Sequence, residues 1–294
     1  MSKPRCQWKG CTPAHLHLTF LVGKRKTPRF ENQYYCSQDC LRAYLQQEFA
    51  ERWRRLENDK LRRTLRPKLG AILLQTTPLT PVQLQEAVSL QKQYQNGRLG
   101  EWLMRLGFLE ERHITQAVAR QFGLPIIDLK HCDARIEAVQ LLPGRVAKPS
   151  LCLPVSLDDH QSTLRIAMMG PVNFNLQEAI RRMLNKSVMV YIGDRSAIES
   201  LLDRWYQDAE KDLEAVPTYS SLDDLLKMAE TIVEAAMENR VENIQAELLA
   251  DLFWVRFDFQ NRCHHVVYRR ALSPAQNVET APDALLVSGN YGNS

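Results

Sequence analysis

Four cysteines near the start of the chain have the residue type and spacing of metal ligands. Two short pairs, Cys6 with Cys11 and Cys36 with Cys40, are separated by a segment of hairpin length. In a reducing compartment, clustered thiols indicate a metal site rather than disulfides. Zinc accepts four thiolates tetrahedrally, and in so small a segment the metal replaces the core that the residues cannot build. We therefore predict a structural zinc ion here, with four unligated buried cysteines as the alternative.

A repeated segment in the middle of the chain is the second pattern that can carry chemistry. Residues 68–91 and 98–121 each begin with a basic residue followed by Leu-Gly, and each ends with glutamine. A capping box at Thr80 and the glycines Gly97 and Gly123 mark the limits of the longer helices. The pattern predicts two tandem helical hairpins.

The start of each repeat suits a ligand that carries phosphate or guanine. Glycine lacks a Cβ and lets a ligand approach the backbone, and the free N–H groups of a helix N-terminus attract an anion. An arginine can contact a phosphate or the O6/N7 edge of guanine. Two related copies suit a ligand with two related halves. The alternative is that each Leu-Gly is a turn and that the leucines only form a core.

In tandem, the Arg-Leu-Gly-x-x-Leu pattern resembles the N-terminal domain of GspE/PilB-type secretion and pilus-assembly ATPases, called MshEN in its cyclic di-GMP-binding form. The resemblance covers about residues 66–206 and continues through the segments 121–129 and 164–173. It implies a repeat packed on a small α/β part at residues 131–206, with cyclic di-GMP as the ligand. The ligand-binding residues that it implies are Lys68, Leu69, Gly70, Gln91, Arg98, Leu99, Gly100, Glu101 and Gln121.

Four positions depart from the pattern of the family. Lys68 replaces an arginine, Thr77 replaces the turn glycine, Gly170 stands where aspartate is usual, and Glu101 is one methylene longer than aspartate. Lysine lacks the fork of an arginine, and a lost aspartate removes an acceptor for guanine N–H groups. We therefore expect the second repeat to contribute more to binding than the first.

The N-terminal part is strongly basic. Residues 1–70 carry 16 Lys and Arg against 6 Asp and Glu, whereas residues 71–294 carry 22 against 28. The run from Cys36 to Tyr44 resembles treble-clef zinc fingers, and it leads into a helical pattern with arginines on its polar faces. A zinc finger beside a basic helix can bind nucleic acid, but no aromatic RNA-binding signature accompanies it and a charged face is usually solvated. Nucleic acid is the weakest of the partners considered.

The C-terminal part shows no catalytic signature. Residues 222–272 resemble a degenerate form of the segment that opens the C-terminal half of these ATPases, with Gln245 where histidine is usual. None of the 12 glycines falls in a Gly-x-x-x-x-Gly-Lys-Ser/Thr loop, which would cradle nucleotide phosphates. Neither HExxH nor GxSxG occurs, so we do not expect an enzyme.

Together, these patterns predict an α+β protein with six parts. They are a zinc finger (1–45), a basic connecting helix (46–66), an MshEN-like domain (67–206), a linker (207–221), a degenerate α/β segment (222–272) and a flexible tail (273–294). No apolar run is long enough to span a bilayer and the N-terminus has no apolar h-region, so we expect a cytoplasmic protein.

The leading functional hypothesis is a non-catalytic, cyclic di-GMP-responsive adaptor with a protein partner in a secretion, pilus or motility apparatus. A scaffold that docks its partner without any nucleotide is the first alternative. A zinc-dependent nucleic-acid binder is the second.

Overall fold

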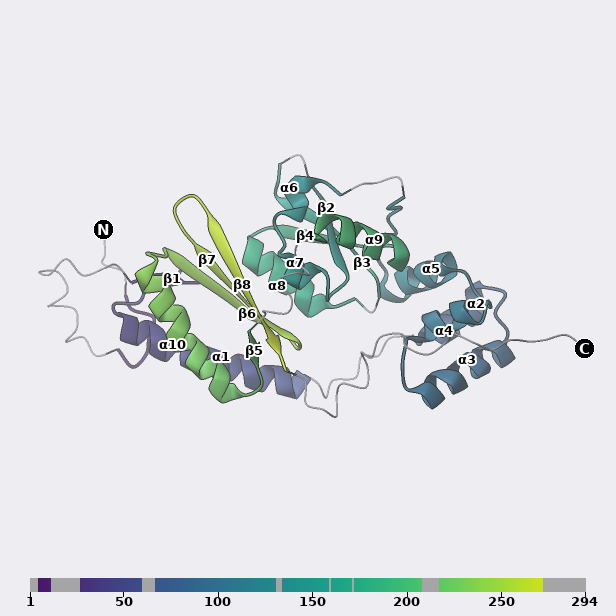
Figure 1. The fold of residues 1–294 in the computed structure, drawn as a ribbon, viewed down its shortest axis with the longest axis horizontal. Coiled ribbons are helices and arrows are strands. Elements are labelled where there is room, and N and C mark those ends of the chain that lie inside the picture. Colours follow the sequence, from purple (N-terminus) through teal and green to yellow (C-terminus); the bar gives the residue numbers. More distant parts are fainter. Residues whose placement is uncertain are drawn as a thin grey trace, which may run out of the picture.

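The computed structural model describes residues 5–11, 27–59, 67–130, 134–158, 160–170, 172–207 and 217–271. The end of the basic helix at residues 60–66, most of the linker and the tail beyond residue 271 lie outside these ranges. The described chain forms a helical repeat, a small α/β part and a five-stranded sheet with its own helices (Figure 1). The predicted α+β class is confirmed.

The repeat consists of two helical hairpins, as predicted. Its helices are α2 (Leu69–Thr76), α3 (Pro81–Tyr94), α4 (Leu99–Arg105) and α5 (Glu111–Phe122). Thr80 and Gln83 form the predicted capping box at the start of α3, and Gly123 ends α5 in the left-handed conformation, with φ 65°. The hairpins exchange partners, because α2 packs on α5 and α3 packs on α4. Each copy therefore completes the other.

The α/β part follows the repeat and shares its core. Its elements are α6 (Ile136–Val139), α7 (Gly144–Ala147), β2 (Cys152–Leu157), β3 (Thr163–Met168), α8 (Phe174–Leu184), β4 (Ser187–Ile192) and α9 (Arg195–Trp205). The strands are ordered β2-β3-β4, and helix α8 connects the parallel pair β3 and β4. Alternating buried residues such as Leu164, Ile166 and Met168 on β3 join the helices of the repeat in one apolar cluster.

A second core joins the two ends of the described chain. The five-stranded sheet contains β1 (Arg29–Phe30), β5 (Thr218–Tyr219), β6 (Asn243–Leu248), β7 (Leu252–Asp258) and β8 (Cys263–Arg270), in the order β1-β6-β7-β8-β5. Helices α1 (Gln38–Asp59) and α10 (Leu222–Glu238) pack on each other along one face of this sheet (Figure 1). We call this assembly of β1, α1, β5, α10 and β6–β8 the terminal unit.

Helix α1 has a different position from the connecting helix expected from the sequence. It begins at Gln38, so the boundary expected between residues 45 and 46 falls inside it. Its apolar residues Leu41, Leu45 and Phe49 are fully buried in the core of the terminal unit, and the Phe49 ring meets the Phe253 ring edge-on, with centroids 5.0 Å apart. The helix therefore covers a sheet whose strands, apart from β1, all begin at Thr218 or later in the sequence.

The expected linker also contributes to the sheet. Thr218 and Tyr219 form strand β5, which pairs in parallel with Arg269 and Arg270 of β8. Ser221 then caps α10 through a capping box with Asp224. No helix among the described residues is both long and apolar enough to cross a membrane.

The other face of the five-stranded sheet meets helix α8 of the α/β part. Arg182 of α8 binds the buried carboxylate of Glu247 on β6 with two hydrogen bonds, of 2.5 and 3.0 Å. Arg256 on β7 donates to the carbonyl of Met183, near the C-terminal end of α8. The sheet thus lies between α1 and α10 on one side and α8 on the other.

Candidate functional site

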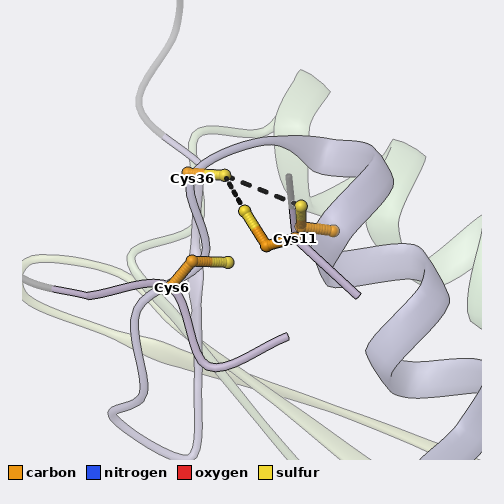
Figure 2. A group of neighbouring side chains, drawn as sticks. Cys6, Cys11 and Cys36 are labelled. Carbon is orange, nitrogen blue, oxygen red and sulfur yellow. Dashed lines mark hydrogen bonds between the residues drawn. The ribbon is translucent and has the colours of Figure 1, made fainter. Parts of the chain in front are cut away.

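The four predicted metal ligands come together at one end of the terminal unit. Their sulfur atoms all lie within 4.8 Å of one another, with 3.5 Å between Cys11 and Cys36 and 3.6 Å between Cys36 and Cys40 (Figure 2). A tight turn positions the first pair, because the Cys11 N–H donates to the Trp8 carbonyl at 3.1 Å. The second pair lies at the start of α1, where the Ser37 hydroxyl accepts from the Cys40 N–H at 3.2 Å. The cluster can hold a metal ion.

The chemistry of this donor set favours a bound cation. Burial and the neighbouring thiols of Cys11, Cys40 and Cys6 raise the pKa of the Cys36 thiol. Four thiolates crowded together repel one another unless a positive charge lies between them. Tetrahedral zinc with Zn–S bonds of about 2.3 Å holds sulfur atoms about 3.8 Å apart, which matches this spacing. His15 and His17, which are candidate substitute ligands in the sequence, lie outside the described residues.

Arg98 at the start of the second repeat is engaged inside the molecule. Its guanidinium donates to the Gly170 carbonyl at 2.5 Å and to the Met169 sulfur at 3.2 Å. Partial burial of the guanidinium lowers the pKa of Arg98 from its ordinary value. The two acceptors are neutral, so they compensate a positive charge less well than a carboxylate or phosphate does.

Glu101, another charged residue predicted to contact ligand, is ion-paired with Arg195 at the start of α9. Arg195 also binds Glu199 at 2.6 Å, one helical turn further on. The second carboxylate oxygen of Glu101 accepts from the Arg98 backbone N–H at 3.3 Å, which satisfies a free donor at the N-terminus of α4. Glu101 therefore joins the repeat to the α/β part, and a ligand must compete with Arg195 for it.

The two predicted glutamines hold the repeats together in a crossed arrangement. Gln91, at the end of the first copy, donates to the Gly97 carbonyl, directly before Arg98, at 3.0 Å. Gln121, at the end of the second copy, donates to the Pro67 carbonyl, directly before Lys68, at 2.6 Å. Each glutamine fixes the start of the other repeat.

The glycines of the Leu-Gly pairs lie in close contact with apolar side chains of the repeat. A Cβ on Gly100 would lie 2.8 Å from Ile114 Cγ2, and a Cβ on Gly70 would lie 3.2 Å from the Leu84 methyl carbons. Both glycines are buried, while Leu69 and Leu99 pack at the edge of the core. These contacts favour the core interpretation of the glycines, and Lys68 remains exposed beside them.

Two of the departures from the family pattern have local structural consequences. A Cβ on Gly170 would lie 2.4 Å from Val118 Cγ1, so this chain has no room for an aspartate there without rearrangement. Thr77 has φ −134°, whereas Gly107, its counterpart in the second copy, has φ 70°. Glycine is needed only for the second turn, because the first uses an extended backbone that any residue adopts.

The basic residues of α1 do not form one continuous charged surface. Arg52 is ion-paired with Glu48 at 2.8 Å and with Glu31 at 2.6 Å, and it also donates to the Ala246 carbonyl. Arg54 and Arg55 are exposed, and the remaining basic positions of the predicted helix lie outside the described residues. Arg52 thus stabilises the terminal unit rather than offering a contact for nucleic acid.

Sequence reasoning missed Arg195 and the partners of Arg98. The spacing of Arg195 and Glu199 indicates a surface ion pair on a helix, but nothing in the local sequence points to Glu101, 94 residues away.

Comparison with known proteins supports the resemblance. The MshEN domain family matches residues 122–212, which covers the α/β part and leaves both repeats outside the match. The type IV pilus assembly ATPase PilB of Thermus thermophilus is 28% identical over 173 residues, 59% of this chain and 19% of that protein. PilB of Myxococcus xanthus is 24% identical over 222 residues, 68% of this chain and 38% of that protein.

A solved structure of MshE with cdg is 34% identical and covers 48% of this chain and 100% of that chain, with a TM-score of 0.42. The chain spans well under half the length of the two PilB relatives. The chain therefore contains an MshEN domain and is a relative of the pilus-assembly and type II secretion ATPases.

Proposed function

We propose that this chain is a non-catalytic regulatory protein that binds cyclic di-GMP through the start of its second repeat. The observation that carries the proposal is the environment of Arg98, whose guanidinium contacts only neutral acceptors among the contacts described above. A phosphate or the O6/N7 edge of guanine offers this arginine a stronger, charge-assisted pair of hydrogen bonds. The resemblance of the tandem motif to cyclic di-GMP-binding MshEN domains supports the same ligand.

In the free protein, Arg98 and Glu101 already have intramolecular partners, and competition from these partners lowers the affinity for ligand. The ligand must displace the Gly170 carbonyl from Arg98, and a guanine that uses Glu101 must displace Arg195. The first repeat offers Lys68, a solvated point charge without the planar fork of arginine. We therefore expect affinity weaker than that of a domain with two arginines and the family aspartate.

Isothermal titration of the metal-loaded full chain with cyclic di-GMP tests this proposal. We expect saturable binding by the wild type, a loss of at least tenfold in affinity for Arg98→Ala, and a smaller loss for Lys68→Ala. Arg112→Ala is the matched control, because Arg112 lies on α5 of the same repeat, where it pairs with Glu110 at the surface. Absence of heat at millimolar ligand for both the wild type and Lys68→Arg would refute nucleotide binding.

A nucleotide-free scaffold is the second candidate, and a specific observation favours it. Glu101, Gln91 and Gln121 each have an intramolecular partner, so the repeat is complete without a ligand. In this case the chain retains the MshEN fold only to dock a partner. For either candidate, we place the protein in the cytoplasm with a protein partner from a secretion, pilus or motility apparatus.

We also propose that the metal held by Cys6, Cys11, Cys36 and Cys40 is a structural zinc ion. A set of four sulfur ligands leaves no open coordination position for catalysis. Elemental analysis of the purified chain should find about one zinc per chain, and Cys36→Ser should lose it. Cys263→Ser, which changes an exposed cysteine outside the cluster, should keep the metal. Metal-free wild-type protein would contradict the proposal.

A further inference from the structure

Helix α8 packs on α5 of the repeat at one end and contacts the five-stranded sheet of the terminal unit at the other. Three residues separate Gly170 from its N-terminal end, where Asn173 is the N-cap. Its C-terminal end carries Arg182 and Met183, which contact Glu247 and Arg256 of the five-stranded sheet. With 11 residues, the helix spans about 16 Å. Figure 1 shows it between the two sheets.

The N-terminal end of α8 is held by the second repeat. Arg98 bonds to the Gly170 carbonyl, and a Cβ on that glycine would contact Val118 of α5. The rings of Phe122 on α5 and Phe174 on α8 also meet, with centroids 6.1 Å apart. When Arg98 turns to a ligand, the Gly170 carbonyl loses a charge-assisted donor. Met169 and Gly170, directly after β3, must then find another hydrogen-bond arrangement.

The C-terminal end of α8 meets polar side chains of the five-stranded sheet, and these side chains allow an alternative set of hydrogen bonds. Arg256 donates to the Met183 carbonyl and pairs with Asp258 at 2.6 Å. On the neighbouring strand, directly opposite Arg256, the side-chain oxygen of Gln245 is buried and has no hydrogen-bond partner within the described part of the chain. An unpaired buried acceptor is costly. If α8 withdraws, Arg256 can donate to Gln245 instead of Met183.

We propose that α8 couples the hydrogen bond between Arg98 and Gly170 to the contacts of Arg182 and Arg256 with the five-stranded sheet. Ligand binding at the second repeat then weakens the attachment of the terminal unit to the MshEN domain by some factor. By linkage, detachment of the terminal unit strengthens ligand binding at Arg98 by the same factor. The ligand-dependent part of this inference rests on the proposed function. The mechanical coupling does not, because both ends of α8 are engaged in the free protein.

Hydrogen–deuterium exchange of the full, metal-loaded chain without ligand tests the coupling. Arg98→Ala should speed exchange at least threefold in β6 and β7, although Arg98 touches neither strand. If the Arg98→Ala variant does not fold, the Arg98→Gln variant is measured in its place. Arg112→Ala, at the surface of the same repeat, should leave both strands unchanged.

The reverse direction provides an independent measurement. Glu247→Gln removes the charge that holds Arg182 and should speed exchange at residues 164–176, next to Arg98. Its control is Glu178→Gln, which breaks a surface ion pair on α8 itself. In the double variant of Arg98 and Glu247, the two effects should be less than multiplicative.

Changes confined to the mutated end of α8, or fully multiplicative effects, would overturn the coupling. Titration with cyclic di-GMP is a separate arm of the experiment. If wild-type protein does not bind it, the proposed function fails, while the ligand-free variants still decide whether α8 couples the two ends.

Discussion

At the scale of single residues, Gly70 and Gly100 occupy equivalent positions but differ in the space around them. A Cβ on Gly100 meets Cγ2 of Ile114, which is stiff at χ1, whereas a Cβ on Gly70 meets the flexible methyl ends of Leu84. We predict that Gly100→Ala lowers the free energy of unfolding by about 1–3 kcal/mol. Gly70→Ala should be near neutral, because alanine gains up to about 1 kcal/mol of helix propensity.

Urea unfolding of the two glycine variants measures this difference. Equal effects at both positions would contradict the packing explanation. Unchanged stability of both variants, together with weaker cyclic di-GMP binding by both, would instead indicate that both glycines serve ligand approach.

Residue types in the site were predictable, but their partners were not. The sequence indicates that Arg98, Glu101 and the two glutamines are functional, and all four lie where the repeat begins or ends. Their partners Gly170, Arg195, Gly97 and Pro67 belong in part to segments far along the chain. Spacing describes one face of one helix, so it does not identify a partner that only the tertiary fold supplies.

At the scale of elements, the sequence predicts that a helix forms more reliably than it predicts which elements pack against the apolar face of that helix. The stripe of Leu41, Leu45 and Phe49 correctly indicates that α1 has an apolar face. The same pattern is compatible with a connecting helix, and only the tertiary structure shows that α10 and the sheet cover it. The two-residue strands β1 and β5 are too short for any periodic signal, so the order of the five-stranded sheet could not be predicted.

At the scale of the whole molecule, the MshEN domain lies in sequence between two halves of one terminal unit. The cysteine cluster fixes the start of α1, and β1 adds to the edge of β6, where the Glu31 N–H donates to the Ile244 carbonyl at 2.8 Å. We therefore expect loss of a metal at this cluster to affect more than residues 1–45. A metal ion at the cluster would support a core to which residues 217–271 also belong.

We predict that chelation of the metal, or Cys36→Ser, speeds hydrogen exchange at least tenfold in α1, β1, β6 and α10. The physical reason is that ligand release frees the start of α1, whose buried Leu41, Leu45 and Phe49 complete the core of the terminal unit. Helix α5 and strand β3 belong to the other core, so their exchange should change by less than twofold. Cys263→Ser, which leaves the cluster intact, should behave as wild type.

Faster exchange restricted to residues 5–11 and 27–37 would show that the cysteine cluster is a separate finger. An equal increase in both cores would instead show that the two units unfold as one.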